Sequence, residues 1–269
     1  MALTDKTQAA AAAKADRPVL ETENLGIVFG GLHAVEDVHF SLKREQIMGL
    51  IGPNGAGKTT VFNLLTGVYT PTTGQIMLEG ESLLGKKTYQ ITKLGIARTF
   101  QNIRLFKDMS VLDNVRVAMN QKMKYSALAG ILGLPSYWRE EAEIEEKAME
   151  LLRVFHLEGN ASDRAKNLPY GQQRKLEIAR ALAADPKVLL LDEPAAGMNP
   201  TETAELMETI KLIRERFHVA ILLIEHDMSF VMGVCEHLVV LDYGRIIASG
   251  TPEEVRTNPK VIAAYLGGE

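Results

Sequence analysis

The chain has 269 residues, 46% of them hydrophobic and 24% charged, so it can bury a substantial core in one large or two small domains. Its net charge of −4 provides no broad attraction to nucleic acid, and we expect no nucleic-acid partner. The single cysteine, Cys235, excludes an internal disulfide. Its apolar neighbours predict a buried thiol in a protein of the reducing cytoplasm.

The sequence contains no pattern typical of secretion or of a membrane span. Residues 1–14 include an alanine run without the basic start and apolar core of a signal peptide, and we expect 1–17 to be a flexible tail. The longest apolar candidate, 127–134, is far shorter than the roughly 18 residues that a membrane span needs. It also runs into Pro135. If the protein works at a membrane, we expect it to do so from outside the bilayer.

Three strand-like runs open the ordered part of the chain, at 19–29, 34–42 and 46–51. The third run ends directly at Gly52, which begins a match to the pattern G-x-x-x-x-G-K-[ST]. Glycines at 52, 55 and 57 allow successive backbone N–H groups to turn inward around a phosphate. The helix expected at 59–67 would direct its positive end at the same anion. This loop therefore predicts binding of a nucleotide triphosphate.

Residues of this loop have distinct predicted roles. Lys58 reaches the β and γ phosphates, and Thr59 ligates Mg²⁺. The predicted nucleotide contacts in the loop are Gly52, Asn54, Gly55, Ala56, Gly57, Lys58, Thr59 and Thr60.

The next elements in chain order are a turn, a short strand, a helix and a strand, expected at 69–74, 75–78, 88–94 and 97–100. From about 102 to 165 the character becomes helical, with helices predicted at 111–122 and 138–155. The glutamates between 140 and 146 fit a solvated helix face better than an acidic ligand site. We therefore predict a helical insertion in this part of the chain.

Alternation of helices and strands resumes after the insertion. We expect helices at 171–184 and 201–216, a further short helix, and strands at 187–191, 219–224, 238–241 and 245–248. Short runs of Val, Ile and Leu with little polar alternation are typical of buried parallel strands. The sequence predicts an α/β core carrying a helical subdomain, without an internal repeat.

Polar side chains follow three of these strands. Asp192 and Glu193 end one strand, where the first carboxylate can hold Mg²⁺ and the second can deprotonate an attacking water. Gln101 and His226 follow two others. Because the carboxyl ends of parallel strands line the ligand crevice of an open α/β sheet, we expect these four side chains near the phosphates.

The segment Leu168-Pro-Tyr-Gly-Gln172 opens a helix, and it completes a resemblance that covers about 19–250. In the order of phosphate loop, glutamine, this pentapeptide, acidic pair and histidine, the chain resembles the ATP-binding-cassette ATPases. That family usually has Leu-Ser-Gly-Gly-Gln, so Pro169 puts the serine's contact with the γ phosphate in doubt. Asn199 stands where the family has Asp, and we expect it to cap the next helix before Pro200.

The resemblance implies a fold and a domain organisation. The expected fold is α/β: a P-loop NTPase (RecA-like) core with an antiparallel β subdomain and an inserted helical subdomain. One domain would span 18–269, with the nucleotide-binding core at 18–100 and 166–269 and the helical subdomain at 101–165.

The resemblance also implies an ATPase with ATP and Mg²⁺ as cofactors. Its expected catalytic residues are Lys58, Gln101, Glu193 and His226, its metal ligands Thr59, Gln101 and Asp192, and its further nucleotide contacts Phe29 on adenine and Tyr170, Gly171 and Gln172. A second ATPase subunit, identical or a sister, would pair head to tail so that the signature of one clamps ATP on the phosphate loop of the other.

A finer resemblance, in segments such as Phe29-Gly-Gly-Leu-His-Ala-Val, is to the ATPases of branched-chain amino acid importers. It implies two permease subunits, a periplasmic substrate-binding protein and a place on the cytoplasmic face of the bacterial inner membrane. Urea or amide importers, lipopolysaccharide exporters and an ATP-binding regulatory module are the alternatives. A P-loop kinase would leave 168–172 without a role. Residues 127–134 and Trp138 could contact the permease or pack inside the helical subdomain.

Overall fold

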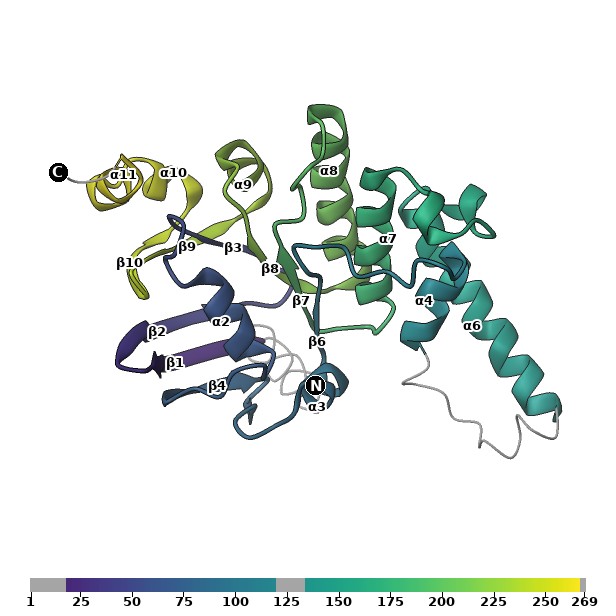
Figure 1. Cartoon of the computed structure of the whole chain (residues 1–269), viewed down its shortest axis with the longest axis horizontal. Helices are drawn as coiled ribbons and strands as arrows, with labels where there is room; N and C mark the ends of the chain where they lie inside the picture. The colour runs from purple at the N-terminus through teal and green to yellow at the C-terminus, as the bar shows by residue number, and fades with distance from the viewer. Residues whose placement is uncertain (1–17, 120–133, 267–269) are drawn as a thin grey trace, which may run out of the picture.

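The computed structural model describes residues 18–119 and 134–266 (Figure 1). One of its two sheets is antiparallel, with the order β2-β1-β4-β5. Its strands are β1 (Leu20–Phe29), β2 (Leu32–Leu42), β4 (Thr73–Leu78) and β5 (Glu81–Ser82). Exposed and buried residues mix along β1 and β2, as expected where one face of a sheet packs on a core and the other meets water.

The second sheet carries the order β10-β9-β3-β8-β7-β6 and is parallel except for its β10 edge. Its strands are β3 (Ile47–Ile51), β6 (Ile96–Arg98), β7 (Val188–Asp192), β8 (Ala220–Ile224), β9 (His237–Asp242) and β10 (Arg245–Gly250). Every residue of β3, β7 and β8 is buried, because both faces of these strands are covered. The parallel order brings the carboxyl ends of β3, β8 and β7 to one edge.

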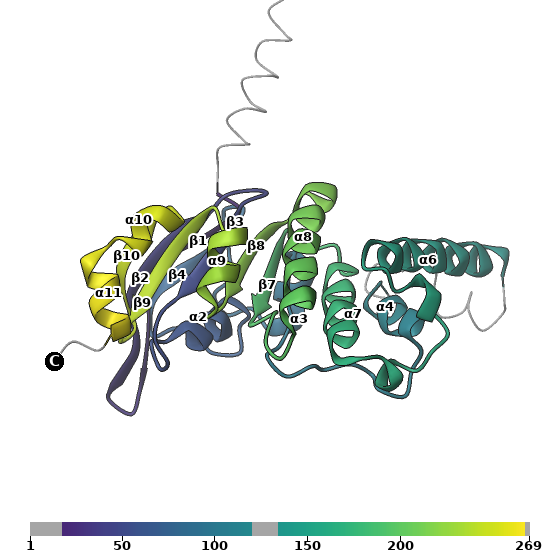
Figure 2. The same ribbon diagram turned by 90° about the horizontal axis from the view of Figure 1, so that it is seen from above.

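Helices lie on both sides of this sheet. They are α2 (Lys58–Leu65), α3 (Thr88–Leu94), α4 (Val111–Met119), α6 (Pro135–Val154), α7 (Tyr170–Leu182), α8 (Pro200–Phe217), α9 (Met228–Val234), α10 (Pro252–Arg256) and α11 (Pro259–Leu266), with short 3₁₀ turns at Glu158–Asn160 and Ala165–Asn167. In both views, α7 lies between α8 and the α4–α6 pair, at the far end of the molecule from β1 and β2 (Figures 1 and 2).

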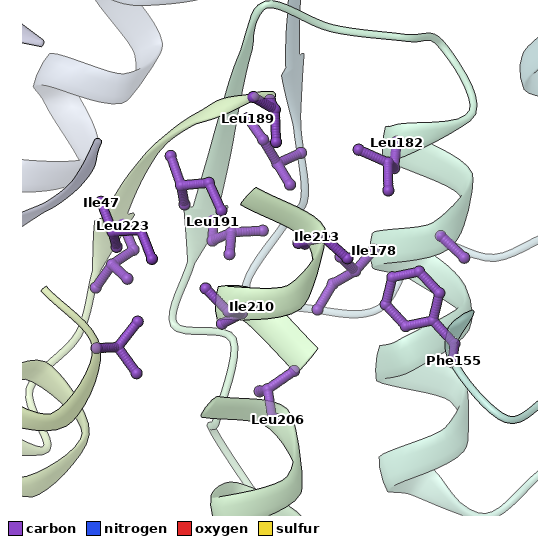
Figure 3. Close-up of a cluster of buried hydrophobic side chains, with 14 of the residues drawn as sticks. Ile47, Phe155, Ile178, Leu182, Leu189, Leu191, Leu206, Ile210, Ile213 and Leu223 are labelled. Atoms are coloured by element: carbon purple, nitrogen blue, oxygen red, sulfur yellow. The ribbon is translucent and has the colours of Figure 1, made fainter. Parts of the chain in front are cut away.

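Alternate residues of the central strands point into two separate cores. Leu189 and Leu191 of β7 pack with Phe155, which directly follows α6, and with residues of α7 and α8, among them Ile178, Leu206, Ile210 and Ile213 (Figure 3). Val188 and Leu190 instead belong to the core that joins the antiparallel sheet and α2 to the opposite face. The strand period of two thus explains why one short apolar run supports both layers.

Most expected elements are present, and the differences lie at their ends. The strand predicted at 97–100 spans Ile96–Arg98, because the chain leaves the sheet where the Phe100 carbonyl accepts a hydrogen bond from Arg174 of α7. The helix predicted to begin at Trp138 begins at Pro135, since proline fits the first helical turn, where its missing N–H needs no partner. Residues 1–17 and 120–133, with most of the 127–134 segment, lie outside the described residues.

Exposure distinguishes the two readings of Trp138. Its side chain is 65% exposed and meets the Tyr137 ring edge-on. The interpretation that Trp138 packs inside the helical subdomain is therefore wrong. Cys235 is buried, as expected. Among residues 18–119 and 134–266, no helix has the length and apolar character needed to cross a bilayer.

Candidate functional site

The phosphate loop leaves β3 and bends sharply before α2. Gly52, Gly55 and Gly57 all have positive φ angles, of 149°, 81° and 102°. A methyl carbon built on Gly52 would lie 2.1 Å from the Leu241 carbonyl oxygen, so the loop passes too close to β9 for any side chain. The N–H of Gly244 donates to the Ala56 carbonyl at 2.9 Å and supports the loop from the β9–β10 turn. The loop is therefore shaped by its own backbone and by its neighbours.

Lys58 is folded back over this loop. Its Nζ donates to the carbonyl oxygens of Gly52 at 2.7 Å and Pro53 at 2.8 Å. Burial lowers the pKa of the Lys58 amine, and the negative charges of Glu193 and Asp192 oppose that shift. These charges act on one another because β3, β8 and β7 end at the same edge of the sheet. The arrangement suits a cation that can be transferred from carbonyl oxygens to phosphate oxygens.

Asp192, the last residue of β7, forms a buried ion pair. Its Oδ2 accepts a hydrogen bond from Arg98 Nη2 at 2.6 Å, and the two side chains are only 6% and 8% exposed. Arg98 Nη1 also donates to Asn63 Oδ1 on α2 at 2.7 Å. The end of β6 thus fixes the Asp192 carboxylate beside the helix that follows the phosphate loop.

Glu193 has two polar neighbours, which lie in the segments after β6 and β8. Gln101 Nε2 donates to Glu193 Oε2 at 2.8 Å, and His226 Nδ1 lies 4.0 Å from Glu193 Oε1. Glu193 has a φ of 47°, a conformation uncommon outside glycine and often found at functional sites. The structure therefore brings together Gln101, Glu193 and His226. In the sequence, Gln101 lies 92 residues before Glu193, and His226 lies 33 residues after it.

Glu225 orders the backbone around that group. Its side chain is 1% exposed, and its oxygens accept hydrogen bonds from the N–H of Ala195 at 2.8 Å and of His226 at 3.1 Å. Burial raises the pKa of the Glu225 carboxyl, and these two hydrogen bonds oppose the shift. One buried carboxyl thus joins the loop after β7 to the turn after β8.

Phe29 ends β1 at the surface. Its side chain is 43% exposed and meets the Tyr69 ring edge-on, with centroids 5.2 Å apart. Phe29 is therefore a surface residue and not part of the core. Two exposed aromatic rings side by side offer a surface on which a flat ring can stack.

The segment 168–172 lies at the start of α7, in a different part of the molecule from α2 (Figures 1 and 2). Pro169 occupies the N-cap position without a capping side chain, and the Tyr170 side chain is 46% exposed. Gly171 is buried, and Gln172 lines a groove of about 870 Å³ between α6, α7 and α8. A single copy of the chain does not bring this segment to its own phosphate loop.

Arg174 ties α7 to the segment around Gln101. It is fully buried and donates to the carbonyl oxygens of Phe100 and Gln101, both at 2.6 Å, and to Glu177 at 2.9 Å. Glu177 in turn accepts from the Arg104 N–H at 3.1 Å. Burial raises the pKa of the Glu177 carboxyl, opposed by that N–H and by the Arg174 charge.

Oxygen donors at the sheet edge fit Mg²⁺. Thr59 lies exposed on the first turn of α2, and Asp192 ends β7. Mg²⁺ takes one or two protein carboxylate or hydroxyl oxygens together with substrate phosphates, so it needs no larger cluster. Among the described residues there is no group of three or more His, Cys, Asp or Glu side chains suited to a metal.

Sequence reasoning missed several residues of this site: Asn63, Tyr69, Arg98, Arg174, Glu177 and Glu225. Arg98, Arg174 and Glu177 stand on a strand or helix where a charged side chain reads as solvated. The burial of such a charge is visible only in three dimensions. Glu225 directly precedes His226, and its place at the end of an apolar strand is the one signal that could have identified it.

Comparison with known proteins identifies the family. Residues 35–196 match the ABC transporter family, and residues 245–269 match the branched-chain amino acid ATP-binding cassette transporter family. The chain is 48% identical to the high-affinity branched-chain amino acid transport ATP-binding proteins BraF of Pseudomonas aeruginosa and LivG of Escherichia coli K12. Each alignment covers 93% of this chain and 98% of the relative.

A solved structure has the same fold. The ADP conformation of MJ1267, an ATP-binding cassette of an ABC transporter, superimposes with a TM-score of 0.80 at 30% identity, over 93% of this chain and 99% of that one. Together with the family match over more than half of the chain, this similarity extends to the phosphate loop, the acidic pair and the segment before α7. The chain therefore belongs to the ABC transporter family, as an ATP-hydrolysing cassette.

Proposed function

We propose that this chain is the ATPase subunit of an importer of branched-chain amino acids. The observation that carries the hydrolytic assignment is the grouping of Glu193 with Gln101 and His226 beside Lys58. The match of residues 245–269 and the names of the 48% identical relatives support the transported substrate.

In this proposal the phosphate loop binds the nucleotide first. The N–H groups of the glycine-rich turn and the start of α2 would surround the β and γ phosphates, and Lys58 would exchange its two carbonyl partners for phosphate oxygens. Phe29 and Tyr69 would provide the surface for adenine. Thr59, Gln101 and Asp192 would hold Mg²⁺. When bound, the metal ion neutralises charge on the phosphate oxygens.

Glu193 would accept a proton from the attacking water. Gln101 holds one of its carboxylate oxygens, and the His226 ring next to the other oxygen can stabilise the charge that develops on the γ phosphate. These neighbours fix the direction of the carboxylate before ATP arrives, which is the main contribution of positioning in phosphoryl transfer.

A second ATPase subunit would complete the site. Tyr170, Gly171 and Gln172 open α7, which lies apart from α2 (Figures 1 and 2), and the positive end of α7 can meet the γ phosphate of a partner's ATP. ATP would then close a head-to-tail dimer and its cleavage would reopen it, driving two permease subunits at the cytoplasmic face of the inner membrane. A periplasmic receptor would supply the amino acid.

Replacement of Glu193 by Gln in the assembled transporter tests the hydrolytic role. We expect Glu193→Gln to retain ATP binding, to lower turnover by about 10²–10⁴-fold, as for loss of a general base, and to accumulate the closed dimer. Glu208→Gln, at an exposed position of α8, is the matched control and should hydrolyse ATP normally. Wild-type turnover of Glu193→Gln would contradict the assignment.

Reconstitution with the permeases tests the transported substrate. We expect ATP turnover to rise when the receptor carries leucine, isoleucine or valine. Stimulation by urea or by lipopolysaccharide alone would instead indicate a related importer or an exporter. Absence of any stimulation would indicate a regulatory module, and labelled phosphate on an acceptor other than water would indicate a kinase.

A further inference from the structure

The Tyr170 ring lies on the loop that follows β7. A methyl carbon built on Gly197 would lie 3.0 Å from Tyr170 Cε1 and 3.3 Å from Cζ, closer than a side-chain carbon normally approaches a ring. Gly197 also has a φ of 78°, which favours glycine. The backbone conformation therefore favours glycine at position 197, and a larger residue there would push the Tyr170 ring aside by a few tenths of an ångström.

Gly171 makes a second contact with the same region. A methyl carbon built on it would lie 2.5 Å from Glu202 Oε1, so the backbone of α7 rests directly on that carboxylate. Glu202 Oε2 accepts from the Asn199 N–H, and the Glu202 N–H donates to Asn199 Oδ1, both at 3.0 Å. This reciprocal pair is the capping box of α8. Gly171 therefore contacts the Glu202 carboxylate that holds the end of the 195–199 loop.

Backbone contacts continue from this loop to Glu193. The Ala196 N–H donates to the Glu193 carbonyl at 3.2 Å, and the Met198 N–H donates to the Ala195 carbonyl at 3.1 Å. The Ala195 N–H is held by the buried Glu225, next to His226. A displacement of Gly197 would therefore be transmitted through these hydrogen bonds to the backbone of Glu193, four residues earlier in the chain.

We propose that Tyr170 is a positioning residue whose ring, seated on Gly197, links the segment that serves the partner's ATP to the loop that positions this chain's own Glu193. The inference rests on the proposed function. Since Tyr170 is 46% exposed at the start of α7, closure of a partner onto it presses the ring against Gly197. Occupancy of one nucleotide site then affects turnover at the other.

The test uses the complete transporter, with ATP turnover measured as a function of ATP concentration. The variants are Tyr170→Phe, Tyr170→Ala, Gly197→Ala and the double variant Tyr170→Ala with Gly197→Ala. Tyr89→Ala, at a 56% exposed tyrosine of α3, is the matched control. We expect Tyr89→Ala to remain within about twofold of wild type, and Tyr170→Phe, which retains the ring on Gly197, to turn over ATP several-fold faster than Tyr170→Ala.

Tyr170→Ala should lower kcat by about tenfold, bring the Hill coefficient for ATP towards one and leave Tm unchanged. Gly197→Ala should lower kcat at least as much, and by a smaller factor in the Tyr170→Ala background, because the clash with the ring is then absent and only the cost of the positive φ remains. Independent effects of the two substitutions, or a Tyr170→Phe variant as slow as Tyr170→Ala, would overturn the inference. A wild-type complex without ATP turnover would contradict the proposed function instead.

Discussion

The phosphate loop and the signature segment, Leu168–Gln172, are held in different ways. The loop is fixed by contacts near in sequence, such as those of Lys58 Nζ with the Gly52 and Pro53 carbonyl oxygens, and by β9 behind it. The signature segment is instead tied to distant parts of the chain, for example through Arg174 of α7, whose side chain donates to the Gln101 carbonyl. The loop is therefore a preformed anion site, whereas the signature segment follows the elements on which it rests.

The largest expected effect on stability is that of replacing Arg98, which holds Asp192 at the phosphate-binding edge of the sheet. Arg98→Met would leave the buried Asp192 carboxylate without its partner, and we expect a loss of about 3–5 kcal/mol in the free energy of unfolding. Urea titration measures it. Arg245→Met, which removes an exposed pair with Glu36, is the control and should cost less than about 1 kcal/mol. Equal losses in the two variants would show that the sheet edge is not a preformed buried unit.

Substitution of two glycines of the phosphate loop separates the effect of steric contact with β9 from the effect of a positive φ. Gly52→Ala places a methyl carbon against the Leu241 carbonyl, and we expect a loss of about 2–4 kcal/mol in the free energy of unfolding. In Gly55→Ala the new methyl carbon meets no atom within 4 Å, and the positive φ of 81° alone should lower the free energy of unfolding by about 1–2 kcal/mol. Thermal unfolding of both variants measures the difference. If Gly55→Ala were the less stable, support of the loop by β9 would be refuted.

Glu225 provides the smallest effect, visible in the pH dependence of stability. Because burial raises the pKa of Glu225 above 4.5, the folded state holds this proton more tightly than the unfolded state. The free energy of unfolding should therefore fall as pH rises from 4.5 through the raised pKa. Glu225→Gln should show a shallower fall, with Glu177 supplying the remainder, in Tm measured across this range. A steeper fall in the variant would contradict the buried role of Glu225.

Sequence reasoning placed correctly the structural features that depend on local order. The phosphate loop, the strand ending at Asp192 and Glu193, and the Asn199 cap all combine residues within a few positions of one another. It failed where two distant segments meet: Arg98 and Asp192 are 94 residues apart, and Arg174 and Phe100 are 74 apart. Periodicity assigns such arginines to a solvated face, and tertiary packing determines instead that they are buried.

The burial of Cys235 makes the protein suitable for site-specific labelling. It is the only cysteine in the sequence and lies buried behind Gly49 of β3. Burial, with the charges of Glu225 and Glu236, raises the pKa of its thiol to about 12. Since the thiolate is the reactive form, Cys235 should resist maleimide and spin-label reagents at neutral pH. One engineered surface cysteine could then carry a fluorophore that reports dimer closure, in a chain that needs no other alteration.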